Sequence, residues 1–148
     1  MNLTDEMKKQ LLETRVAFIE RTGVKALELE RGHVKLMAPL KGNENHIGTM
    51  YAGALFTVAE VVVGALWLAS FDVSKYYPII KEMTIRYLRV AKSDVTIELT
   101  ISEEQIGNIL EEVEEEGKAE FVLEGEVKDV SGEVVATSRG VYQMRSFG

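Results

Sequence analysis

The chain has 148 residues, 46% of them hydrophobic, and a formal net charge of −7. A chain of this length suits a single domain that can bury about two-thirds of its unfolded surface. The acidic balance argues against a nucleic-acid partner, which is usually met by a basic face. The absence of cysteine excludes disulfides, thiolate nucleophiles and cysteine zinc sites. The first residues lack the layout of a secretory signal, so a cytoplasmic location is expected.

The first predicted element is an amphipathic surface helix over residues 4–23. Thr4 is a suitable N-cap, and Gly23 is a suitable stop. The apolar residues between them recur at roughly helical spacing: Met7, Leu11, Leu12, Val16, Phe18 and Ile19. Residues 24–30 and 33–39 then read as two short strands around Arg31-Gly32, which predicts a hairpin.

Residues 49–71 form a nearly unbroken apolar run with one carboxylate, Glu60, near its middle. The run is too long for an ordinary strand, so it predicts a helix that is apolar on all sides. Its length would also span a bilayer. However, Glu60 would lie near the bilayer centre, and the nearest basic residues are as distant as Lys41 and Lys75. A buried central helix is therefore expected instead of a membrane span.

After Pro78 the hydrophobic pattern changes to a period of two, which predicts strands with one wet and one buried face. Residues 103–116 predict a short helix whose glutamates face solvent, and residues 130–133 predict the turn of a C-terminal hairpin. The chain is therefore expected to form one α+β domain over residues 1–148, with a curved antiparallel sheet of five to six strands wrapped around one long central helix.

One sheet covers only part of a helix that is apolar on every side, so a second copy of the chain is expected to cover the remainder. A homodimer is the minimum assembly on this argument. The sequence leaves a homotetramer open.

The motif NHIGTMYAGALFTVAE, residues 45–60, is similar to the helix-start motif of the hotdog-fold thioesterases. TIRYLRVAKSDVTIELTI resembles the strand after their central helix, and GKAEFVLEGEVKDVSGEVVATSRGVYQMR resembles their C-terminal hairpin. The pattern Gly48-Thr49-x-x-x-Gly53-Ala54-Leu55 resembles a bacterial group of thioesterase-like proteins related to the C-terminal domain of the YiiD acetyltransferase-like protein. The resemblance implies a hotdog fold, no cofactor, and hydrolysis of an acyl-CoA or acyl-carrier thioester.

Four residues are the candidate catalytic groups. If the helix begins near residues 50–53, the backbone amides of Ala52 and Gly53 are free to hold a carbonyl oxygen, aided by the helix dipole. The resemblance implies that Glu60 acts as nucleophile or general base and that Asn45 orients the thioester or water at a dimer interface. Eight helical residues separate Ala52 from Glu60 by about 12 Å, so the substrate or a partner subunit must bridge them.

Candidate substrate-binding residues are His46, Gly48, Thr49 and Tyr51 in the motif loop, together with Arg86 and Arg89, whose charges suit the phosphates of coenzyme A. A solvated strand face is an equal explanation of the two arginines, and solvent exposure is the simpler one for His46. His33, beside a turn, is expected to be incidental. Two histidines without a nearby carboxylate cluster at ligand spacing predict no metal site.

The motif departs from the family pattern at Tyr51-Ala52, where many active members carry a histidine followed by two glycines. This departure favours either an altered substrate or a protein that binds the acyl group without hydrolysing it. A non-catalytic acyl-group or acyl-CoA binding protein has the same fold, and Glu60 is then a structural carboxylate. A hotdog dehydratase is a third reading, but it requires a histidine near the helix start, where Tyr51 stands. The sequence gives neither the acyl chain nor the choice between coenzyme A and a carrier protein.

Overall fold

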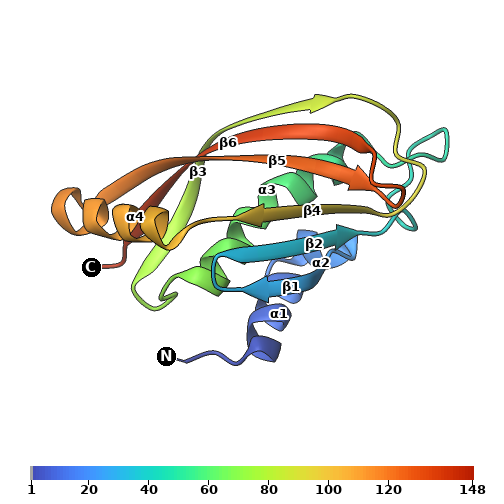
Figure 1. Cartoon of the computed structure of the whole chain (residues 1–148). Coiled ribbons are helices and arrows are strands. Elements are labelled where there is room, and N and C mark those ends of the chain that lie inside the picture. Colours follow the sequence, from blue (N-terminus) through green and yellow to red (C-terminus); the bar gives the residue numbers. More distant parts are fainter. Residues whose placement is uncertain (1) are drawn as a thin grey trace.

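The computed structural model describes residues 2–148 as six antiparallel strands in one sheet that curves around a long helix (Figure 1). The strands are β1 (Lys25–Glu30), β2 (His33–Ala38), β3 (Tyr76–Tyr87), β4 (Val95–Thr100), β5 (Lys118–Asp129) and β6 (Val134–Ser146). The helices are α1 (Asp5–Thr14), α2 (Ala17–Thr22), α3 (Ala52–Ser70) and α4 (Glu103–Glu116). The order in the sheet is β1-β2-β4-β5-β6-β3, so β1 and β3 form its two edges. The predicted α+β class and the wrapped helix are confirmed.

Helix α3 forms the core because residues on several of its sides are buried, among them Val58, Val62 and Ala65. The sheet packs over it with Leu36 and Ile97, each at most 1% exposed. At the C-terminal end, the Ser70 hydroxyl accepts a hydrogen bond from the Gly32 amide at 2.9 Å, which joins the helix to the β1–β2 turn. Although α3 is long and apolar enough to cross a membrane, 61% of that stretch is buried within the fold, as in the core helix of a globular domain.

The N-terminal segment differs from the prediction because it forms two helices instead of one. Thr4 caps α1 as predicted, with its side chain accepting from the Met7 amide at 3.1 Å. The helix stops at Arg15, and Val16 takes an extended conformation before α2 begins. The Thr14 hydroxyl donates to the Gln10 carbonyl at 2.7 Å, a contact that loosens a helix end. Periodicity alone did not show this break.

The edge strand β3 begins at Tyr76, two residues before the position at which the alternating pattern was read. It pairs antiparallel with β6 along its length, from Tyr76 opposite Ser146 to Tyr87 opposite Ala136. The pairing register shifts between Ile80 and Glu82. Among residues 2–148, β6 is the only strand that pairs with β3, so no strand pairs with the other edge of β3.

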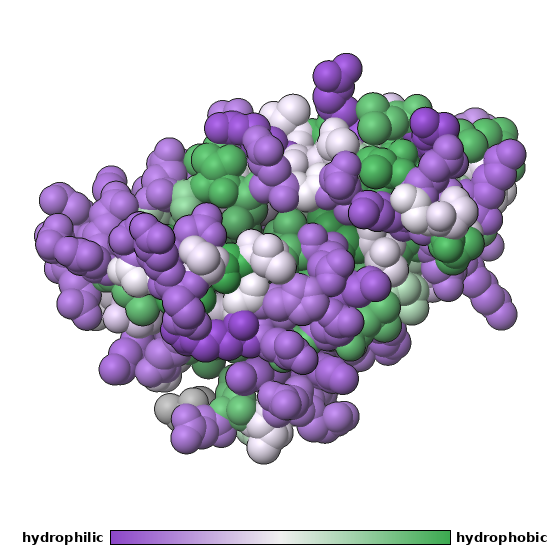
Figure 2. All heavy atoms as spheres, in the orientation of Figure 1, coloured by the Kyte–Doolittle hydropathy of each residue, from purple (hydrophilic) through white to green (hydrophobic). Residues whose placement is uncertain are grey.

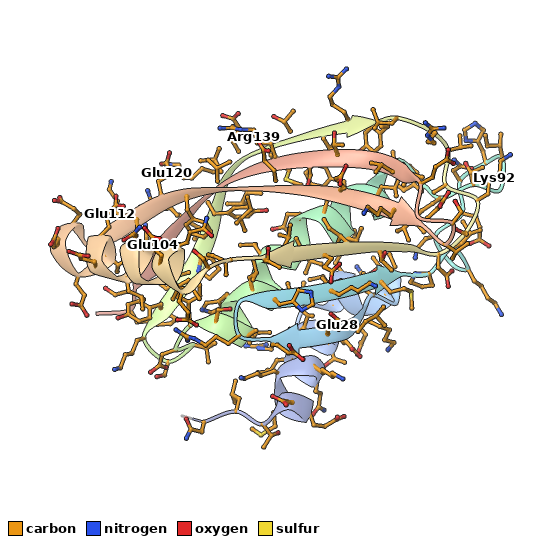
Figure 3. The ribbon with its side chains drawn as sticks, in the orientation of Figure 1. Glu28, Lys92, Glu104, Glu112, Glu120 and Arg139 are labelled. Atoms are coloured by element: carbon orange, nitrogen blue, oxygen red, sulfur yellow. The ribbon has the colours of Figure 1, made fainter. Side chains whose placement is uncertain are left out.

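Helix α4 has the predicted bounds and places its glutamates in solvent. Ser102 and Gln105 form a reciprocal capping box at its start, and Ile106, Ile109 and Val113 are buried. In Figure 3, Glu104 and Glu112 project away from the fold. Hydrophilic residues predominate over this helix in the space-filling view (Figure 2). The glutamate cluster is therefore a solvated surface.

Candidate active site

Two backbone amides at the start of α3 are free. Tyr51 is the N-cap, and its carbonyl accepts from the amides of Ala54 and Leu55 at 2.9 and 3.2 Å. Within residues 2–148, the amides of Ala52 and Gly53 have no hydrogen-bond acceptor in the protein. Such amides, with the positive end of the helix dipole, suit an anion or a polarised carbonyl oxygen.

Two tyrosines lie beside these amides. A Cβ atom placed on Gly53 would lie 2.5 Å from Cε2 of Tyr51, so the glycine allows the Tyr51 ring to rest against the first turn. The Tyr87 hydroxyl donates to the Ala52 carbonyl at 3.2 Å and ties the end of β3 to the helix start. Burial, with a smaller effect from Tyr51, raises the pKa of Tyr87, so this hydroxyl remains a donor.

Asn45 uses its side chain within its own loop. Its Oδ1 accepts from the amides of Ile47 and Thr49, each at 3.0 Å, and its Nδ2 donates to the Thr49 hydroxyl at 2.8 Å. Gly48 closes the loop with a left-handed φ of +83°, a conformation that glycine adopts without strain. Asn45 and Thr49 therefore shape the approach to the helix start, while His46 is exposed to solvent.

Glu60 lies half-buried in the middle of α3, and no hydrogen bond or ion pair to its carboxylate is found among the described residues. Burial raises its pKa, because an ionised carboxylate loses hydration in the fold. Tyr142, on β6, is 2% exposed, and burial followed by the negative charge of Glu60 raises the pKa of its hydroxyl. An unpaired, half-buried carboxylate is available to accept a proton or to bind a polar group.

Glu60 lines a largely apolar hollow of about 500 Å³ between α1–α2, α3 and the start of β3. This volume lies within the range of small-molecule sites. The lining residues are Leu11, Leu12, Arg15, Val16, Ile19, Glu60, Val61, Val63, Gly64, Trp67, Leu68, Val73, Tyr77, Pro78, Ile79 and Ile80. The carboxylate therefore stands at the wall of a site large enough for an acyl group.

The two candidate arginines lie elsewhere in the chain's fold. Arg86 lines a separate polar hollow with Glu98 and Arg139, on the outer face of the sheet on which Arg139 is labelled in Figure 3. Arg89 pairs with Glu133 at 3.0 Å. Neither residue lines the hollow that contains Glu60, so one chain does not bring these charges to the carboxylate.

His33 has two carboxylate neighbours, which the sequence did not reveal. Its Nδ1 lies 3.2 Å from Glu28 Oε2, and its Nε2 bonds to Glu98 Oε2 at 2.5 Å. These are the three side chains whose donor atoms are close enough to hold a metal ion within residues 2–148. Hydrogen bonding to Glu98, and then the nearby charges, raises the pKa of His33. Carboxylates at both ring nitrogens are the surroundings of a protonated imidazole.

Sequence reasoning missed Tyr87, Tyr142 and the wall built by α1 and α2. One signal for Tyr142 is the sequence Gly140-Val141-Tyr142, because a Cβ at Gly140 would lie 2.6 Å from the Tyr142 hydroxyl oxygen. The glycine lets the ring lie along the strand. The sequence contains a weaker signal for the wall of the hollow formed by α1 and α2, because that wall depends on the break between the two helices.

A buried helix, a wrapping sheet, free amides and a half-buried glutamate define a hotdog-fold protein of the thioesterase-like class. The chain belongs to the family of a domain of unknown function, DUF4442, whose model matches residues 4–144. No curated protein matches it.

Solved structures agree with this assignment. A Pseudomonas aeruginosa protein of unknown function, described as a probable thioesterase, is 51% identical, with a TM-score of 0.94 and coverage of 99% of this chain and 98% of that one. A Chlorobaculum tepidum protein of unknown function is 17% identical, with a TM-score of 0.80 and coverage of 95% and 93%. A Haemophilus influenzae thioesterase is 12% identical, with a TM-score of 0.76 and coverage of 99% and 93%. The last two likenesses concern the fold alone.

Proposed function

We propose that the protein hydrolyses the thioester of an acyl-CoA or an acyl-carrier protein. The observation that carries the proposal is the unpaired, half-buried carboxylate of Glu60 at the wall of an apolar hollow. The 51% identical relative described as a probable thioesterase supports the same class of reaction.

In the proposed reaction, the Glu60 carboxylate takes a proton from water while the water oxygen attacks the thioester carbonyl carbon. The free amides of Ala52 and Gly53 hold the carbonyl oxygen as it becomes negative. Collapse of the tetrahedral intermediate breaks the carbon–sulfur bond, and the proton on Glu60 passes to the leaving thiolate. The products are a carboxylic acid and a free thiol. Direct attack by Glu60, followed by hydrolysis of the anhydride, is the covalent version of the same reaction.

A homodimer is part of the proposal because the two halves of the site are far apart in one chain. Ala52 and Glu60 are separated by about 12 Å along α3, farther than one carbonyl group can reach. Several large apolar side chains in the motif loop, on α3 and along or just after β3 are exposed to solvent. They are Ile47, Tyr51, Phe56, Ile80, Tyr87, Leu88 and Val90, each at least 37% exposed. A second copy over this surface would bring its own helix start near Glu60.

The first test is thiol release from a panel of acyl-CoA esters by the wild type and by Glu60→Gln. The chain contains no cysteine, so all thiol detected comes from the substrate. Removing a general base typically costs a hundredfold or more in rate, and we expect kcat to fall by about that factor. Glu112→Gln, in an exposed glutamate of α4, should retain wild-type turnover.

Two results would contradict the proposal. Undiminished turnover in Glu60→Gln would exclude the catalytic role of this residue. Tight binding of acyl-CoA by the wild type, measured by calorimetry, without any thiol release would identify a non-catalytic acyl-binding protein.

A further inference from the structure

Three residues at helical spacing line the hollow along one face of α3. Glu60, Gly64 and Trp67 follow one another at intervals of four and three residues, so their positions lie on one side of the helix. Leu68 continues the same wall. The hollow therefore follows α3 for about two turns, or about 12 Å, starting at Glu60.

Gly64 occupies the middle of this wall, and neither backbone conformation nor packing requires a glycine there. Its φ is not positive. A Cβ placed on it would meet only Leu12 Cδ1, at the ordinary contact distance of 3.9 Å. Glycine inside a helix is less favourable than alanine. The effect of Gly64 on the structure is to leave the space beside α3 open.

The surroundings of Gly64 are apolar. Leu12 from α1, Ile19 from α2 and Ile79 from β3 line the hollow together with α3. The Trp67 ring is held in place because its Nε1 donates to the Tyr76 carbonyl at 2.7 Å. Charged groups are limited to Glu60 and Arg15 among the lining residues. A polar acyl group would lose hydrogen bonds to water here without replacing them.

We propose that Gly64 determines the chain length of the substrate, which is a linear fatty-acyl thioester of medium length. The inference rests on the proposed function. The carbonyl group lies near Glu60, and the acyl chain passes over Gly64 toward Trp67 and Leu68. An extended polypeptide advances by about 3.3–3.6 Å per residue, which has three backbone bonds. An extended acyl chain therefore advances by about 1.2 Å per bond. A hollow about 12 Å long therefore holds about ten bonds of an extended acyl chain, or a chain of about ten carbons.

The test measures kcat/KM for straight-chain acyl-CoA esters from acetyl to palmitoyl in the wild type, Gly64→Ala and Gly64→Leu. We expect the wild type to prefer octanoyl or decanoyl esters. In Gly64→Leu, kcat/KM for those esters should fall at least tenfold, since even one methylene in an apolar pocket changes selectivity by about that factor. The loss should be smaller for acetyl and butyryl esters, so the ratio of kcat/KM for decanoyl-CoA to kcat/KM for butyryl-CoA should fall in Gly64→Leu relative to the wild type. Gly64→Ala should show a smaller shift in the same direction and, since alanine favours the helix, should fold.

Gly107 provides a matched control because it also lies inside a helix, α4, with nothing within 4 Å of its added Cβ. Gly107→Leu should keep the wild-type chain-length profile. If the wild type hydrolyses thioesters and the Gly64 variants keep the wild-type profile, the inference is wrong while the proposed function stands. If the wild type shows no turnover, the proposed function fails. Calorimetry then decides the inference, because Gly64→Leu must weaken binding of decanoyl-CoA relative to acetyl-CoA.

Discussion

The Glu60 carboxylate is held in an environment that favours its neutral form. Burial raises its pKa, and no cation or hydrogen-bond donor within residues 2–148 compensates for the lost hydration. A raised folded-state pKa means that the folded chain holds this proton at pH values where the unfolded chain has released it. Stability therefore falls as pH rises from the ordinary glutamate pKa through the raised one. Function would explain why such a residue is present in a core helix.

Glu60→Gln should accordingly be more stable than the wild type at neutral and alkaline pH. Glutamine has nearly the same shape and carries no charge to desolvate. We expect a higher Tm for the variant at about pH 8, with about 2–4 °C for each kcal/mol gained, and convergence of the two proteins near pH 4, where glutamate is largely protonated in both states. Calorimetric unfolding across this range measures the difference. A variant less stable than the wild type at pH 8 would show that the carboxylate has a stabilising partner.

At the scale of the elements, Glu13 connects helix α1 to the free edge of β1. Its Oε2 accepts from the Ala26 amide at 3.0 Å, and its Oε1 lies 3.4 Å from Lys25 Nζ. Ala26 is 7% exposed, so its amide has little access to water. This contact satisfies an edge-strand donor and also holds in place the helix that forms one wall of the hollow.

Glu13→Ala should destabilise the fold and loosen that wall. A buried amide left without an acceptor costs about 1–3 kcal/mol, and each kcal/mol lowers Tm by about 2–4 °C in a chain of this size. Thermal unfolding measures the loss, and the acyl-CoA panel should show weaker preference for medium chains. Glu13→Gln keeps an acceptor oxygen and should recover most of both properties. Equal loss in the two variants would assign the effect to charge instead of the Ala26 bond.

The sequence predicted elements whose signals are local. The apolar run around Glu60 predicted the central helix, and the pattern of residues 103–116 predicted α4 with the bounds that the structure shows. The hairpin around Arg31-Gly32 followed from its turn chemistry. The candidate site was predicted less completely. The carboxylates beside His33 come from β1 and β4, and the bonds of Asn45 depend on the loop conformation. The contact of His33 with the carboxylate from β4 joins residues far apart in the sequence, and the bonds of Asn45 require a loop conformation that the residue types alone do not specify.

At the scale of the whole molecule, β3 is an edge strand on which another chain can pair. The strand has 12 residues, and β6 is its single neighbouring strand within residues 2–148, so no strand pairs with its other edge. Ile80 is 41% exposed and Tyr87 is 48% exposed on this strand. Long apolar edges favour pairing with another chain, and exposed apolar patches mark interaction surfaces. When two copies of β3 pair antiparallel about a two-fold axis, the backbone groups of each edge form hydrogen bonds with those of the other. This geometry supports the proposed homodimer.

Ile80→Lys should therefore convert a dimer into a monomer. Lysine on an edge strand opposes pairing. In the dimer the two introduced lysines repel each other, and the apolar contact of Ile80 is lost. Val122→Lys is the matched control, because Val122 is 43% exposed on β5, inside the sheet's order. Light scattering after size exclusion should give twice the chain mass for the wild type and for Val122→Lys, and a single chain mass for Ile80→Lys. The wild-type Tm should also rise with protein concentration, since association stabilises the folded state by mass action. A monomeric wild type, or an Ile80→Lys protein that remains dimeric, would place the partner surface elsewhere and leave Glu60 to act within one chain.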